Sequence, residues 1–141
     1  MNPGMFKVQI IWVKQLRLGD TPQWTTIPGA KWIWKSVFVE YPESGESYMF
    51  QKEFNVNGSP TQSLLSIAGD NSYTLIFNGN FIVATQFWNE GMAQTYGLIS
   101  RTVQGRNVVQ VVVTNYAREN KDIYTNPGGL LFKLKLTWLN I

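Results

Sequence analysis

Alternation of apolar and polar residues with a period of two recurs along this 141-residue chain. In its clearest run, residues 130–138, one face carries Leu130, Phe132, Leu134, Leu136 and Trp138, and the other carries Lys133, Lys135 and Thr137. Successive side chains of a β-strand point to opposite faces, so this pattern predicts a strand with one buried face and one solvated face. No segment of the chain shows a convincing run of apolar residues at the three- and four-residue spacing of an amphipathic helix.

Further runs of this kind divide the chain into about eight strands. Besides 130–138, we expect strands at 6–12, 48–56, 64–68, 73–77, 81–85 and 108–114. The run 108–114 is nearly all β-branched, which favours a place near the middle of a sheet. The dipeptide Asn78-Gly79 predicts a tight hairpin of the primed type. Residues 89–100 are the only segment in which we expect a helical turn.

The spacing of these strands predicts an all-β fold, an antiparallel β-sandwich of the jelly-roll kind. A chain of this length forms one hydrophobic core rather than two. We expect residues 1–28 to form an N-terminal strand or arm ahead of a sandwich at 29–141. Such an arm either closes the sandwich or pairs with a neighbouring subunit.

Two absences from the composition exclude much chemistry. The chain has no Cys and no His, which removes disulfides, thiolate nucleophiles, zinc–thiolate sites and the usual general base. The net charge is only +3, and the basic residues are scattered singly, so nucleic acid is not an expected partner. We therefore expect a protein that is not an enzyme.

Targeting signals are also missing from the sequence. No apolar stretch approaches the roughly 20 residues that span a bilayer, and residues 1–6 lack the basic-then-apolar order of a secretory signal. We expect synthesis in the cytoplasm. The final location stays open and includes incorporation into a virion or another particle.

Four segments in order resemble a known family. They are AKWIW at 30–34, FQKEF at 50–54, AGDNSYTLIFNG at 68–79, and the stretch from Gly105-Arg106-Asn107 to Asn126-Pro127-Gly128-Gly129-Leu130. Together they are similar to the galactose-binding-like jelly-roll domain, as attached to bacterial rhamnosidases and related glycoside hydrolases. The resemblance covers about residues 30–138. It implies a non-catalytic sandwich whose rim loops often bind sugars, on a scaffold that also serves viral and phage particles.

Most residues of these segments also have a purely structural explanation. Asp70 and Asn71 precede a strand, where short polar side chains hold a turn by bonding backbone amides. Asn107 follows a glycine and opens a strand. Four of the six tryptophans lie within or beside strand patterns, where core packing is favoured: Trp12, Trp32, Trp34 and Trp138.

The candidate ligand-binding residues lie in two connections. Trp88 and Asn89 follow the 81–85 run, where a Trp at a loop mouth either packs under the loop or stacks on a ligand. The polar loop 115–126 is long for its position, and long loops on rigid scaffolds often carry binding. Its candidates for bonds to sugar hydroxyls are Arg118, Asn120, Asp122, Tyr124 and Asn126. The alternative is a solvated loop with local ion pairs such as Arg118–Glu119. Trp24 is a lesser candidate.

No metal or cofactor is expected. A calcium site with Asp70, Glu119 or Asp122 as oxygen ligands is an open alternative, although no spacing of the EF-hand type supports it. Glycoside hydrolysis requires two carboxylates held about 5–9.5 Å apart. The nine acidic residues are instead spread over loops and polar strand faces.

Two functions of different classes follow. The first is a non-catalytic recognition module that binds a carbohydrate or a cell-surface ligand. The alternative is a structural or attachment subunit of a larger assembly, such as a virion or phage capsid, a fibre or a decoration protein. In that assembly the 6–13 arm adds a strand to a protein partner or to a second copy. The two roles are compatible.

Overall fold

The computed structural model describes residues 5–10, 27–30, 46–85, 92–115 and 129–139. Within these ranges the elements are β1 Met5–Ile10, β2 Glu46–Val56, β3 Gln62–Asp70, β4 Ser72–Phe77, β5 Asn80–Ala84, β6 Gln94–Gly97, the 3-10 helix η2 Ile99–Arg101, β7 Gly105–Asn115 and β8 Gly129–Leu139. The all-β class predicted from the alternation is confirmed. Across these ranges, no helix has the length and apolar character of a membrane span.

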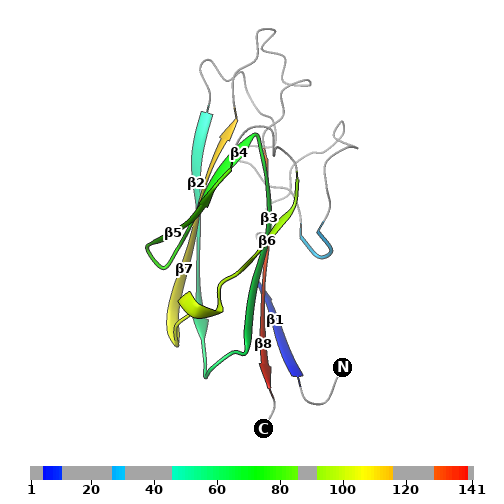
Figure 1. Ribbon diagram of the computed structural model, residues 1–141, viewed down its shortest axis with the longest axis vertical. Helices are drawn as coiled ribbons and strands as arrows, with labels where there is room; N and C mark the ends of the chain where they lie inside the picture. Colours follow the sequence, from blue (N-terminus) through cyan, green and yellow to red (C-terminus); the bar gives the residue numbers. More distant parts are fainter. Residues whose placement is uncertain (1–4, 11–26, 31–45, 86–91, 116–128, 140–141) are drawn as a thin grey trace.

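The strands form two four-stranded sheets that face each other (Figure 1). Their orders are β1-β8-β3-β6 and β2-β7-β4-β5, and every paired strand is antiparallel. The chain passes from one sheet to the other at Asn71, the single residue between β3 and β4, after a cis Asp70–Asn71 peptide bond. The antiparallel sandwich is the predicted architecture.

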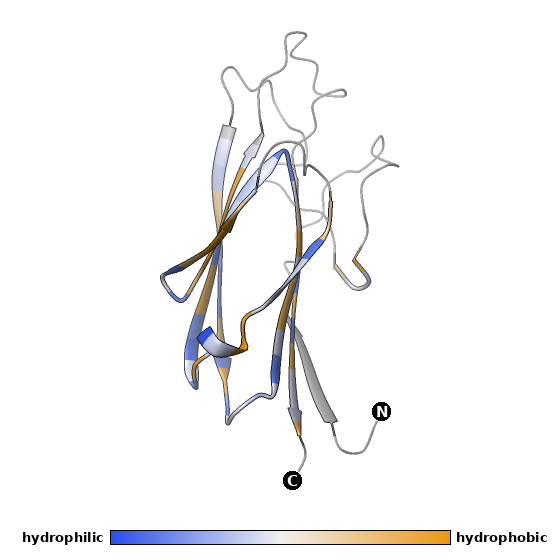
Figure 2. Ribbon diagram, in the orientation of Figure 1, coloured by the Kyte–Doolittle hydropathy of each residue, from blue (hydrophilic) through white to orange (hydrophobic). Residues whose placement is uncertain are grey.

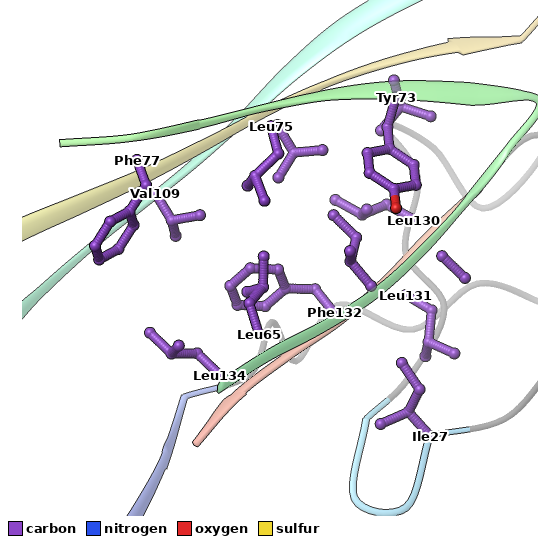
Figure 3. Close-up of a cluster of buried hydrophobic side chains, with 14 of the residues drawn as sticks. Ile27, Leu65, Tyr73, Leu75, Phe77, Val109, Leu130, Leu131, Phe132 and Leu134 are labelled. Carbon is purple, nitrogen blue, oxygen red and sulfur yellow. The ribbon is translucent and has the colours of Figure 1, made fainter. Parts of the chain in front are cut away.

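The core lies between the sheets, where side chains of β3, β4, β7 and β8 meet (Figure 3). Its largest fully buried members include Leu65, Ile67, Leu75, Phe77, Leu130, Leu131, Phe132 and Leu134. Hydrophobic and hydrophilic residues are interspersed along the strands (Figure 2), because alternate residues face the core and the outside. In β8 the predicted face is buried, and Lys133 and Lys135 on the other face are half-buried. The β-branched strand β7 lies between β2 and β4, inside its sheet as expected.

The described part of the N-terminal arm, β1, pairs with β8 of the same chain. The register runs from Met5 opposite Leu139 to Ile10 opposite Leu134. Of the two roles predicted for the arm, β1 therefore has the one that extends its own sheet. The predicted domain boundary after residue 28 remains a prediction.

The helical turn expected within 89–100 is confirmed at the end of that segment, where η2 begins at Ile99. Residues 94–97 form a strand that the sequence did not predict. This strand, β6, pairs with β3 from Leu64 opposite Gly97 to Ile67 opposite Gln94. The alternation did not reveal β6 because this edge strand is four residues long and none of its residues is fully buried.

The edge strand β2 carries a charge on its inner face. Tyr48, Phe50 and Phe54 are half-buried against the core, and Lys52 lies at the same period-two positions and is also half-buried. A charged residue that points inward on an edge strand hinders pairing with a further strand. Lys52 thus interrupts an otherwise apolar face.

The end of the sandwich near η2 is held by two asparagines. Asn78 and Gly79 have φ values of 49° and 76°, so the hairpin between β4 and β5 is of the predicted primed type. The amide nitrogen Nδ2 of Asn78 donates to Oδ1 of Asn107 at 2.8 Å. Asn107 is fully buried and makes three further hydrogen bonds with Val103 and Gly105. These two asparagines, here called the amide clamp, therefore have the structural role that the sequence indicated.

Candidate functional site

All seven predicted ligand-binding residues lie outside the described residues. They are Trp88, Asn89, Arg118, Asn120, Asp122, Tyr124 and Asn126. The structure does describe the strand ends that border the two segments containing these residues. Strand β5 ends at Ala84, before the segment with Trp88 and Asn89. The segment 116–128 lies between the end of β7 at Asn115 and the start of β8 at Gly129.

These strand ends meet at one end of the sandwich, here called the rim, which comprises residues 70–72, 85, 114–115 and 129. Asp70 pairs with Gly129, and Ser72 pairs with Thr114. At the crossing between the sheets, the backbone N–H of Asn71 donates to the carbonyl of Thr114 at 2.8 Å. The rim therefore brings together the ends of β3, β4, β7 and β8.

Thr85 fixes the chain just before the segment with Trp88. Its backbone N–H donates to the carbonyl of Tyr73 at 2.9 Å, and its Oγ1 accepts the backbone N–H of Tyr73 at 2.9 Å. Across the same end, the hydroxyls of Ser47 and Thr114 are 2.7 Å apart. The two connections that carry the predicted ligand residues thus begin at neighbouring, hydrogen-bonded positions.

The rim is polar although it closes an apolar core. Asp70, Asn71 and Ser72 are 5%, 5% and 7% exposed. Burying a polar group destabilises the fold unless hydrogen bonds satisfy that group. Three buried polar residues in succession therefore mark the end of the apolar core.

A tyrosine pair joins the two sheets next to the rim. The hydroxyls of Tyr73 on β4 and Tyr96 on β6 are 2.9 Å apart, and Tyr73 is 3% exposed. Burial, reinforced by the bond to Tyr96, raises the pKa of Tyr73 far above its ordinary value. Tyr73 therefore keeps its proton and supports the rim from within the core (Figure 3).

The described carboxylate side chains do not form a catalytic pair. Asp70 lies at the rim, whereas Glu53 is half-exposed on β2 and forms an ion pair with Arg106. The hydrogen bond that Arg106 donates to the carboxylate lowers the pKa of Glu53. Ser72 and Glu53 pair with Thr114 and Val108, which are six residues apart on β7, so about 20 Å separates these positions along the sheet. Glycoside hydrolysis needs carboxylates within about 9.5 Å of each other.

Of the six tryptophans, Trp138 alone falls within the described residues. It lies on β8 at the end opposite the rim, half-buried, and its indole N–H donates to the carbonyl of Asn57 at 3.0 Å. Its role is structural, as expected, although it closes the end of the sandwich rather than filling the centre. The predictions for Trp12, Trp24, Trp32, Trp34 and Trp88 concern residues outside the described ranges.

Metal-ligating residues do not cluster in the part of the chain that the structure describes, where no group of three or more acidic residues could hold an ion. Asp70 is the one calcium candidate from the sequence that falls within these ranges. The calcium alternative, with Glu119 or Asp122, therefore remains a prediction.

No family model matches the chain, and no curated protein matches it. Solved structures do share its fold. The α-L-rhamnosidase of Streptomyces avermitilis, complexed with L-rhamnose, matches with a TM-score of 0.58 and 23% identity over 74% of this chain. An α-L-rhamnosidase from Dictyoglumus thermophilum matches with a TM-score of 0.57 and 20% identity over 77% of this chain.

The match involves only a small part of each enzyme. This chain spans 10% of the Streptomyces protein and 14% of the Dictyoglumus protein. At these identities the likeness concerns the fold, and the fold is that of a small β-sandwich within a much longer chain. The sequence resemblance to the sandwich attached to rhamnosidases is confirmed at that level.

Sequence reasoning missed part of the rim. It treated Asp70 and Asn71 as a turn and Asp70 as a calcium candidate, and it assigned no role to Ser72 or Thr85. The only available signal was a run of polar residues, 70–72, between two apolar strands. Their proximity to Thr114 and Gly129 depends on strand order, which the run does not reveal.

Proposed function

We propose that this chain is a non-catalytic carbohydrate-binding module that recognises a neutral sugar at the rim. The observation that carries the proposal is the meeting of β5, β7 and β8 at the polar residues 70–72. Both connections with predicted ligand residues extend from this one end.

The comparisons support the same function. The matched structures are glycoside hydrolases, one of them complexed with L-rhamnose, and this chain covers about a tenth of that enzyme. A sandwich of this size makes up only a small part of such an enzyme. The absence of Cys and His, together with the wide separation of Asp70 and Glu53, favours recognition over catalysis.

In the proposed complex, amide and hydroxyl groups bond the sugar hydroxyls. Asn120 and Asn126 supply such groups in the long connection, and Trp88 or Tyr124 covers the apolar C–H face of the ring. Recognition through neutral groups suits a chain with few charged residues. The alternative role in a particle relied partly on strand addition by the arm, and β1 is instead paired with β8.

The test is titration of the intact chain with L-rhamnose and D-galactose, followed by ¹H–¹⁵N NMR spectra. Trp88→Ala and Asn120→Ala should each weaken binding about tenfold or more, as expected for central contacts. Phe81→Ala and Asn55→Ala are matched controls, since both residues are exposed and lie on strands outside the rim. The proposal is wrong if the folded chain binds no sugar of a broad neutral panel. Binding that persists in both the Trp88 and the Asn120 variants contradicts recognition by the two connections that extend from the rim.

A further inference from the structure

A small pocket lies on the outer face of the sheet that contains β3 and β8. Its lining residues are Ile27, Pro28, Leu64, Ser66, Lys133 and Lys135, and its volume is about 170 Å³. Pockets for drug-sized ligands measure roughly 300–1,000 Å³. This pocket is therefore suited to a single small ring or a charged substituent.

The sheet register builds the floor of the pocket. Leu64 pairs with Lys135 and Ser66 pairs with Lys133, so two neighbouring cross-strand pairs place an apolar side chain, a hydroxyl and two ammonium groups on one face. The two lysines are two residues apart, which separates their Cα atoms by about 7 Å. The turn 27–30 provides the remaining wall.

The two lysines have different partners. Nζ of Lys133 donates to the carbonyl of Pro28 at 2.7 Å and so fastens the turn to the sheet. Among the described residues, Lys135 has neither a hydrogen-bond acceptor nor a carboxylate partner. None of the six lining residues is acidic. Within the described ranges, the pocket therefore combines a lysine that has no carboxylate partner with apolar surface.

We propose that this pocket binds the carboxylate of an acidic sugar, with Lys135 as the main cation. The carboxylate accepts charge-assisted hydrogen bonds from Lys135 and from the hydroxyl of Ser66, which in turn accepts from the hydroxyl of Thr95, 3.2 Å away. The ring C–H groups contact Leu64 and Ile27. Apolar walls favour an organic ring over a free inorganic anion, which has no apolar surface to bury.

This inference rests on the proposed function in its choice of ligand class, but it concerns a different place. Along β8, Lys133 and Lys135 lie four and six residues from Gly129 at the rim, or about 13 and 20 Å. A sugar bound at the rim and a carboxylate bound in the pocket therefore contact different residues. Variants can test the two sites independently.

The experiment is an NMR titration of the full chain with D-galacturonate, its uncharged methyl ester and sodium sulfate. Lys135→Gln should weaken galacturonate binding about tenfold, the effect expected from losing one hydrogen bond to a charged group. Lys135→Arg should retain most of the affinity. Lys52→Gln, on the other sheet, is the matched control and should leave it unchanged. The affinity for galacturonate should also fall when the salt concentration rises from about 20 to 200 mM.

Four results would overturn the inference. They are equal binding of galacturonate and its methyl ester, no effect of Lys135→Gln on galacturonate affinity, NMR chemical-shift changes confined to the rim, and sulfate binding as tight as that of galacturonate. The last result would show an anion site without sugar recognition. If Lys135→Gln abolishes galacturonate binding while neutral sugars never bind, the pocket is supported and the proposed rim function fails. Urea unfolding of both Lys135 variants checks that any loss of binding is not a loss of folding.

Discussion

The amide clamp near η2 allows a quantitative prediction about Asn107. Its Oδ1 accepts hydrogen bonds from Asn78 Nδ2 at 2.8 Å and from the Val103 backbone N–H at 2.9 Å. Its Nδ2 donates to the carbonyls of Val103 at 2.7 Å and Gly105 at 3.0 Å. The side chain is fully buried, and all four of these bonds are lost in Asn107→Ala.

Each such hydrogen bond contributes about 1 kcal/mol net, and orphaned buried partners add to the cost. Asn107→Ala should therefore lower the free energy of unfolding by about 3–4 kcal/mol. Asn107→Asp keeps the size of the side chain, but its carboxylate cannot donate to the two carbonyls, so an equal or larger loss is expected at neutral pH. Urea unfolding followed by Trp fluorescence should show a midpoint lowered by about 1.5–2 M, for a slope near 2 kcal/mol per M.

Asn55→Ala is the matched control, because Asn55 is an exposed strand residue, and its effect should stay within about 0.5 kcal/mol. A double-mutant cycle with Asn78→Ala tests whether the clamp acts as one unit, since Asn78 also bonds Val108 and Arg101. A coupling energy of at least about 0.5 kcal/mol is expected. A loss below about 1 kcal/mol in Asn107→Ala, or strict additivity, would refute the reasoning.

Three further predictions concern the core. Gly69→Ala places a Cβ 2.9 Å from Cδ1 of Tyr73 and should lower the free energy of unfolding by about 1–3 kcal/mol in urea. The control Gly97→Ala meets no atom within 4 Å and should be nearly neutral. Equal effects of the two substitutions would argue against the clash. Ser63 is 1% exposed and its hydroxyl has no partner among the described residues, so Ser63→Ala should raise stability by up to about 1 kcal/mol in thermal unfolding, and a loss would contradict this. Because the pKa of Tyr73 is raised in the folded state, stability should fall as pH rises above about 10, where Tyr73 ionises in the unfolded chain but not in the folded one. Tyr73→Phe should flatten that dependence, and an unchanged slope would disprove it.

The strands that bury a regular face were predictable from the sequence. In β8 every second residue from Leu130 to Leu136 is buried. Strand β7 is rich in β-branched residues, as is typical of a strand that pairs with a neighbour on both edges, here β2 and β4. The hairpin at Asn78-Gly79 was predictable since few other dipeptides tolerate positive φ at both positions. The short strand β6 was not, because an edge strand with half-exposed residues leaves little hydrophobic period.

The candidate sites were predictable only in part. The sequence selected two polar connections, but their common origin at the rim depends on which strands are neighbours, and periodicity does not determine strand order. The pocket depends on the register that sets Leu64 opposite Lys135, residues about 70 positions apart in the chain. Lys133 and Lys135 looked like an ordinary solvated face until that register placed Leu64, Ser66 and the turn 27–30 around them.

The pairing of β1 with β8 has a practical consequence for handling the protein. Because Met5 is opposite Leu139, the outer ends of these two strands are neighbours at the end of the sandwich farthest from Gly129 (Figure 1). A fluorescent or spin label at Met5 or Leu139 is therefore attached about ten residues of strand away from Gly129. Such a label can report on the protein without touching residues 70–72 of the rim.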